Sequence, residues 1–194
     1  MNIVIMGPPG AGKGTITNRL TKDFDYRLIC AGDLLRTEKA SGSKLGNKIA
    51  SIIDACNLVP DEMITEIIYN EIRKPMSIKT SFLIDGYPRT KKQATSLDMM
   101  INVPIVLWLN VSEETTIKRN LNRGLTSGRP DDSNEEVIRQ RIKNYNETAE
   151  AIKDYYYDKI VEIDGEGTPD EVYKRVIDTL FETVIEPKDI SDII

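Results

Sequence analysis

The sequence predicts an α/β fold in one domain, residues 1–194, with a five-stranded parallel sheet between two layers of helices. Short apolar runs alternate with stretches of helical spacing along the chain, an order that gives parallel strands joined by right-handed crossovers. Of the 194 residues, 40% are hydrophobic and 29% are charged, which suits one folded domain with a sizeable core. Gly7, Asp85 and Asn110 stand where strands are expected to end, the edge at which parallel sheets bind ligands.

Each strand is predicted from a short apolar run flanked by turn or polar residues. In chain order, the runs are 2–6, 26–30, 81–85, 104–110 and 160–163. Because 104–110 is the longest apolar run, we expect it in the middle of the sheet, buried on both faces.

Helical spacing of apolar residues predicts the helices, and cap or turn residues predict their ends. The expected helices cover 13–24, 31 to a break at 42–43, about 45–53, about 61–72, about 90–100, 112–124, 134–157 and 169–181. Ile16 and Leu20, four residues apart, indicate the first of these. Pro60 begins the fourth helix and Pro75 ends it, whereas Ser112 is the expected cap of the sixth.

A glycine-rich loop, GPPGAGKGT at residues 7–15, joins the first strand to the first helix. It matches the Walker A pattern except that Gly14 takes the usual Ser/Thr position and Thr15 follows. Glycines let successive backbone N–H groups converge on phosphate oxygens, and the helix directs its positive end to the same place. We therefore expect the phosphates of a nucleotide to bind at Gly10, Ala11, Gly12, Lys13, Gly14 and Thr15. The hydroxyl of Thr15 is also a candidate Mg²⁺ ligand.

This nonapeptide resembles the phosphate loop of the nucleoside monophosphate kinases, and of the adenylate kinases in particular. The resemblance extends over about residues 1–181. It implies a P-loop fold with a helical NMP-binding insert at about 32–60 and a short, zinc-free lid at about 124–134. It also implies reversible, Mg²⁺-dependent transfer of the ATP γ-phosphoryl group to AMP, which gives two ADP. Two interpretations of the tail, 182–194, stay open: a loosely packed terminus or a segment that docks onto a partner.

A second motif, Asp85-Gly86-Tyr87-Pro88-Arg89, follows the third expected strand. In loop-type nucleotide-binding proteins, an Asp at the end of such a strand holds Mg²⁺ directly or through water. The motif resembles the Asp-Gly-Phe-Pro-Arg segment of the family, which implies that Arg89 grips the acceptor phosphate together with Arg36. The planar guanidinium suits this task because it makes two parallel bonds to phosphate oxygens.

The resemblance assigns a further set of arginines to the lid and its flanking helices. It implies that Arg123, Arg129 and Arg141 surround the phosphoryl group in transfer, with Lys13 and Arg89 completing the catalytic set. The chain is one residue longer than the usual pattern between Arg129 and Arg141, and Arg139 is the alternative to Arg141. Such positive charges are what phosphoryl transfer needs, because its catalysis is mostly positioning and electrostatic stabilisation. The chain has no histidine, so no imidazole can serve as a base.

The resemblance also implies which residues contact the two bases. Arg119 is expected to stack on the donor adenine, and the backbone at Gly167 to contact it. On the acceptor side, the expected AMP-binding residues are Ala31, Gly32, Arg36, Val59, Gly86, Arg89 and Gln93. Gln93 and the opening Gly7-Pro8-Pro9 favour an adenylate kinase. Ala31 stands where pyrimidine (UMP/CMP) kinases have Ala, so that second acceptor class stays open.

Composition excludes several other classes of protein. A net charge of −5 favours neither nucleic acid nor an anionic membrane, and no run approaches the roughly 20 apolar residues of a membrane span. Cys30 and Cys56 have no metal-binding spacing, which favours a reducing cytoplasm. We expect a monomer that binds ATP and AMP. The sequence lacks the Asn-Lys-x-Asp motif expected of a GTPase-type switch. A catalytically silent nucleotide-binding module would not need the lid arginines.

Overall fold

The computed structural model describes residues 1–55, 57–74, 81–127 and 132–184. Its sheet has five parallel strands in the order β2-β3-β1-β4-β5, which confirms the predicted fold class. The strands are β1 (Ile3–Met6), β2 (Tyr26–Cys30), β3 (Ser81–Asp85), β4 (Ile105–Asn110) and β5 (Ile160–Asp164). The expectation for the longest run was wrong in one respect. β4 is buried from Ile105 to Leu109, but it lies between β1 and β5, and β1 is the middle strand.

Eight helices are described between and after the strands. They are α1 (Lys13–Asp23), α2 (Ala31–Ala40), α3 (Lys44–Asp54), α4 (Asp61–Ile72), α5 (Lys91–Met100), α6 (Glu113–Ser127), α7 (Glu135–Tyr155) and α8 (Pro169–Val184). The predicted break between α2 and α3 is confirmed: Gly42 has φ +67° and Ser43 caps α3 by accepting a hydrogen bond from the Gly46 N–H. No helix in the described ranges is both long and apolar enough to cross a bilayer.

The predicted end of α6 at Gly124 was wrong, because the helix continues to Ser127. Gly124 is needed for a close approach instead: a Cβ at this position would lie 2.6 Å from the Asp132 carbonyl oxygen. The chain therefore returns against the side of the helix where only a hydrogen atom fits. The lid prediction, 124–134, overlaps residues 128–131, which lie outside the described residues, as does tail segment 185–194.

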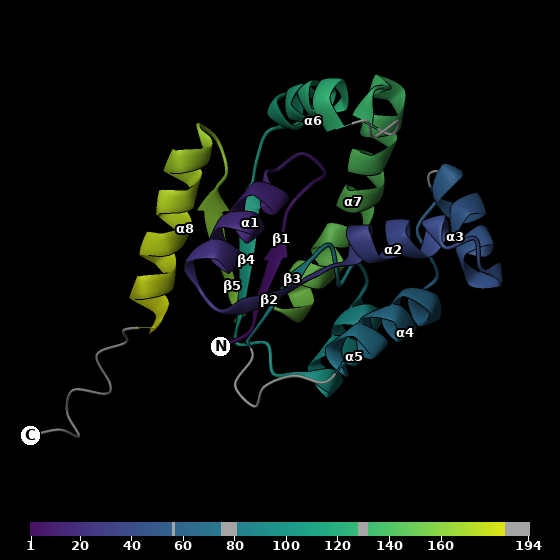
Figure 1. Ribbon diagram of the computed structural model, residues 1–194. Helices are drawn as coiled ribbons and strands as arrows, with labels where there is room; N and C mark the ends of the chain where they lie inside the picture. Colours follow the sequence, from purple (N-terminus) through teal and green to yellow (C-terminus); the bar gives the residue numbers. More distant parts are fainter. Residues whose placement is uncertain (56, 75–80, 128–131, 185–194) are drawn as a thin grey trace, which may run out of the picture.

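Two apolar cores cover the two faces of the sheet. On one face, side chains of α1 and α8 such as Leu20 and Val176 pack on Ile5 of β1. On the other face, α5 and α7 pack on the same strands through residues such as Leu97 and Ile152. Figure 1 shows α2, α3 and α4 extending to one side and α6 lying across the end of the sheet. Because β1 and β3 are parallel neighbours, their carboxyl ends lie at the same edge of the sheet, where the loop between β1 and α1 begins.

Candidate active site

The phosphate loop wraps around the ammonium group of Lys13. The Lys13 Nζ donates hydrogen bonds to the carbonyl oxygens of Gly7, at 2.8 Å, and Pro8, at 3.0 Å. Gly10 has φ +89°, and a Cβ there would lie 2.4 Å from the Asn120 amide nitrogen. The glycine is thus required both by backbone conformation and by the close approach of α6.

Burial has opposite effects on the two charged groups at the centre of the site. It lowers the pKa of Lys13 to about 8; the carboxylate of Asp85 opposes this shift, whereas three arginines deepen it: Arg89, Arg141 and Arg123. Burial raises the pKa of Asp85, and the charges of Lys13 and Arg89 offset only part of that rise. Each group is therefore left with an incompletely compensated charge. A bound phosphate beside Lys13 and a cation beside Asp85 would compensate them.

The side chains of Asp85 and Thr15 carry the oxygen ligands that a magnesium ion prefers. Asp85 is 8% exposed, and its carboxylate accepts a long hydrogen bond from the Cys30 thiol, at 3.9 Å, so it keeps acceptor capacity for a cation. Thr15 lies in the first turn of α1 with an exposed side chain. Mg²⁺ characteristically takes one or two protein oxygens and keeps several waters, so Asp85 and the Thr15 hydroxyl would suffice to hold it.

Asp132 joins two of the predicted arginines. Its carboxylate is fully buried and accepts hydrogen bonds from Arg123 Nε at 2.6 Å, Arg123 Nη2 at 2.8 Å and Arg141 Nη1 at 3.0 Å. Burial alone would raise the pKa of Asp132, but the hydrogen bonds and charges of Arg123 and then Arg141 outweigh it and hold the pKa below its ordinary value. The charges of both arginines also act on Lys13. The third expected lid arginine, Arg129, lies outside the described residues.

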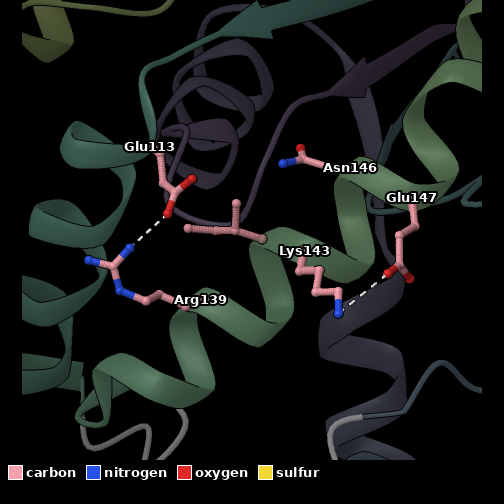
Figure 2. Close-up of a pocket in the computed structure, with 6 residues that line it drawn as sticks. Glu113, Arg139, Lys143, Asn146 and Glu147 are labelled. Atoms are coloured by element: carbon pink, nitrogen blue, oxygen red, sulfur yellow. Dashed lines mark hydrogen bonds and ion pairs between the residues drawn. The ribbon is translucent and has the colours of Figure 1, made fainter.

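The structure brings Arg141, and not Arg139, to the side of Arg123. Arg139 instead pairs with Glu113 at 2.8 Å and with Glu135 at 2.8 Å. A hollow of about 620 Å³ lies between the start of α6 and α7. Arg139 and Lys143 line it, and Figure 2 shows that each faces a glutamate. With its positive charges already paired, this hollow is a poor anion site. The geometry favours the alignment in which Arg141 belongs to the catalytic set.

Arg119 connects the phosphate loop to the turn after β5. Its guanidinium donates to the carbonyl oxygens of Ala11 at 3.3 Å, Gly165 at 3.0 Å and Gly167 at 3.0 Å. The two segments expected to contact the donor nucleotide are thus held together by the arginine expected to stack on its base. These bonds use the edge of the guanidinium plane, so its faces stay available for stacking.

Asn120 is a site residue that the sequence did not reveal. It is fully buried, donates to the Pro9 carbonyl oxygen at 2.9 Å and accepts from Arg123 at 2.8 Å. It therefore links the tip of the phosphate loop to a lid arginine. The available signal was its spacing, since residues three apart share a helix face with Arg123, but many polar residues on helices have such spacing.

The expected acceptor-phosphate residues also meet. A Cβ at Gly86 would lie 3.7 Å from the Ala31 Cβ and 3.8 Å from Arg89 Nη2, and one at Gly32 would lie 3.2 Å from Arg36 Nη1. The exposed Arg36 forms an ion pair with Asp33. Arg36 and Arg89 thus lie next to Gly32 and Gly86, where the lack of side chains would let a phosphate approach the backbone closely.

Gln93 and Val59, the remaining acceptor-side residues, are both buried. Val59 is 8% exposed and packs in the core cluster that includes Tyr87. Gln93 is 4% exposed, and its side-chain amide bonds to the backbone of Arg89 and to Asp61. Asp61 was expected only as part of a helix start, so its contact with Gln93 is a feature that sequence reasoning missed.

Comparison with known proteins gives one consistent result. A family model described as adenylate kinase matches residues 5–161. An adenylate kinase of Thermus thermophilus is 38% identical over 181 residues, covering 90% of this chain and 94% of the relative. That of Flavobacterium johnsoniae is 38% identical over 190 residues, covering 93% and 100%. Adenylate kinase isoenzyme 1 of Gallus gallus is 37% identical over 177 residues, covering 90% and 91%. Nothing in these matches favours a pyrimidine nucleotide kinase.

Proposed function

The chain belongs to the adenylate kinase family, whose members are nucleoside monophosphate kinases, and we propose that it transfers the γ-phosphoryl group of ATP to AMP through the residues gathered around Lys13. The observation that carries this proposal is the convergence of charge: Arg89, Arg123 and Arg141 all act on Lys13, which is enclosed by the phosphate loop. Positive charges held this close together repel one another, and a bound anion would offset that repulsion.

In this proposal, the loop amides and Lys13 bind the phosphates of ATP, while Arg36 and Arg89 bind the phosphate of AMP. The acceptor oxygen then attacks the γ-phosphorus in line, and ADP leaves on the opposite side. No side-chain nucleophile takes part, because the phosphoryl group passes directly between the nucleotides. The arginines stabilise the charge that spreads over the equatorial oxygens in the transition state.

Arg123 and Arg141 exchange the Asp132 carboxylate for the phosphoryl group during the proposed reaction cycle. In the free protein both bind the Asp132 carboxylate. An incoming phosphoryl group also offers a pair of oxygens to each guanidinium, and it carries more negative charge than a carboxylate. We propose that the two arginines contact that group when the lid, 124–134, and the insert, 32–60, close, and that Arg129 joins them. Closure would also exclude the water that could hydrolyse ATP.

Magnesium would be held by Asp85 and, partly through water, by Thr15, and when bound it neutralises charge on the β- and γ-phosphates. We expect the protein to work as a monomer in a reducing cytoplasm. Cys30, the free thiol within the described residues, has its pKa raised to about 11 by burial and by Asp85, so it stays protonated and unreactive at neutral pH.

The test is a panel of acceptors at fixed Mg·ATP, with products separated by chromatography. AMP should be the best acceptor, and each turnover should yield two ADP. CMP or UMP as the best acceptor would move the chain to the pyrimidine kinases. Nucleotide hydrolysis that does not depend on any acceptor would favour a switch protein instead.

A further inference from the structure

A polar cluster, in which Gln93 is buried and Asp61 and Thr90 are half-buried, connects the start of α4 to the start of α5. Asp61 opens α4, Thr90 caps α5, and Gln93 lies in the first turn of α5. The two oxygens of Asp61 accept from Gln93 Nε2 at 2.7 Å and from the Thr90 hydroxyl at 3.0 Å. The Thr90 oxygen in turn accepts from the Gln93 backbone N–H at 3.2 Å. Asp61 is therefore itself held in place on both sides.

The cluster fixes which way the Gln93 amide points. The backbone N–H of Arg89 can only donate, and it meets Gln93 Oε1 at 2.7 Å. The Asp61 carboxylate can only accept, so the atom that faces it must be the amide nitrogen. Two partners of opposite character thus demand the same orientation. Turning the amide over would place a donor against a donor and an acceptor against an acceptor.

This orientation determines what the amide can still bind. A glutamine amide has two N–H donors and two acceptor lone pairs. Within the described residues, one of each is occupied, by Asp61 and by the Arg89 N–H. One donor on nitrogen and one acceptor on oxygen remain. Together they complement a base that presents an amino group beside an unprotonated ring nitrogen.

We propose that Asp61 is a positioning residue that sets the acceptor specificity by holding the Gln93 amide in this orientation; the inference rests on the proposed function. Adenine presents an amino donor next to a ring-nitrogen acceptor, and cytosine shares that pattern. Hypoxanthine and uracil present a carbonyl acceptor next to a ring N–H donor, so they meet the fixed amide with like groups opposed. The amide therefore selects amino bases over oxo bases, and pocket size must separate adenine from cytosine.

AMP and inosine 5′-monophosphate form the cleanest pair of acceptors, because they differ in size by almost nothing and in hydrogen-bond pattern completely. The measurement is kcat/KM for each acceptor at saturating Mg·ATP. The variants are Asp61→Ala, which removes the partner of Gln93, and Asp61→Asn, whose side-chain oxygen can still accept from Gln93 while its nitrogen donates to Thr90. Glu62→Ala is the matched control, since Glu62 shares the first turn of α4 but forms an exposed ion pair with Lys92.

The wild-type protein should prefer AMP to inosine monophosphate by about a hundredfold or more, since the oxo base leaves buried groups unpaired. Asp61→Ala should lower that ratio by about tenfold or more, whereas Asp61→Asn and Glu62→Ala should keep it within about twofold of wild type. An unchanged ratio in Asp61→Ala would overturn the inference, because a purely structural role lowers both activities alike. A wild-type protein that does not use AMP would instead contradict the proposed function.

A measurement on the wild-type protein covers the case in which Asp61→Ala does not fold. The side-chain amide ¹⁵N–¹H signals of Gln93 are followed by nuclear magnetic resonance with each acceptor. AMP should shift the signals and slow the hydrogen exchange of the amide proton that does not face Asp61, while inosine monophosphate at equal occupancy should not. Equal shifts and equal protection with the two acceptors would overturn the inference.

Discussion

Asp132→Asn should destabilise the free protein by about 2–3 kcal/mol. The wild-type carboxylate is fully buried, whereas the side chains of Arg123 and Arg141 are 37% and 28% exposed. Breaking a fully buried ion pair costs about 3–5 kcal/mol and an exposed one at most about 1 kcal/mol. Because the arginines here can recover part of their hydration, the cost falls between these limits. For a domain of this size it corresponds to a fall in Tm of roughly 4–12 °C.

The pH dependence of this difference follows from the lowered pKa of Asp132. A carboxylate whose pKa is lower in the folded state stabilises the protein fully when the pH is above its pKa in the unfolded state, about 3.9. That contribution is lost as the pH falls through the pKa of the folded state. Urea denaturation should therefore show a constant difference between wild type and Asp132→Asn from pH 8 to pH 5. The two stabilities should converge only below about pH 4.

Inorganic tripolyphosphate provides the second arm of the assay. It should stabilise Asp132→Asn more than wild type, because Arg123 and Arg141 no longer have to leave the charged carboxylate of Asp132. Glu113→Gln is the control, since it removes an exposed carboxylate from Arg139 on the same pair of helices. Glu113→Gln should lower the free energy of unfolding by less than about 1 kcal/mol and leave the stabilisation by tripolyphosphate unchanged. Equal stability of wild type and Asp132→Asn at pH 7, or convergence already at pH 6, would refute the reasoning.

Two further comparisons use matched pairs of variants. Arg141→Ala should lower kcat by about a hundredfold or more, while Arg139→Ala should change it less than about twofold; comparable losses in steady-state assays would show that the arginines were assigned wrongly. Gly10→Ala should lower the free energy of unfolding, measured by urea denaturation, by about 2–4 kcal/mol. The positive φ of Gly10 and its contact with α6 exclude a Cβ. Gly14→Ala, with nothing within 4 Å of the added Cβ, should raise the free energy of unfolding by up to about 1 kcal/mol. An equal loss of stability in both variants would contradict this account of the loop.

The features that could be predicted from the sequence are those whose chemistry is local. The phosphate loop needs its glycines, its lysine and the flanking strand and helix within a short stretch, so one segment was enough to identify it. Likewise, Asp85 and Arg89 come directly after an apolar run, and the carboxyl end of that strand places them at the ligand-binding edge. The parallel sheet followed from the alternation of elements in the same way.

The features that could not be predicted depend on contacts between distant segments. Gly124 looked like a helix stop because glycine often ends helices, yet it is there to let the backbone of Asp132 approach. The hydrogen bond between Asp61 and Gln93 joins residues of two helices that are 32 positions apart in the sequence, and nothing at either position marks it. The central place of β1 follows from strand pairing, which apolar length does not reveal.

A crystal structure with a bisubstrate analogue, two adenosines joined by a polyphosphate, tests the central claim most directly. It should place the phosphate chain across Lys13 and Arg89, with Arg123 and Arg141 turned from Asp132 onto the bridging phosphates and Arg139 still paired with Glu113. A polyphosphate bound elsewhere, with Lys13 still bonded only to its own loop and both arginines still on Asp132, would contradict it.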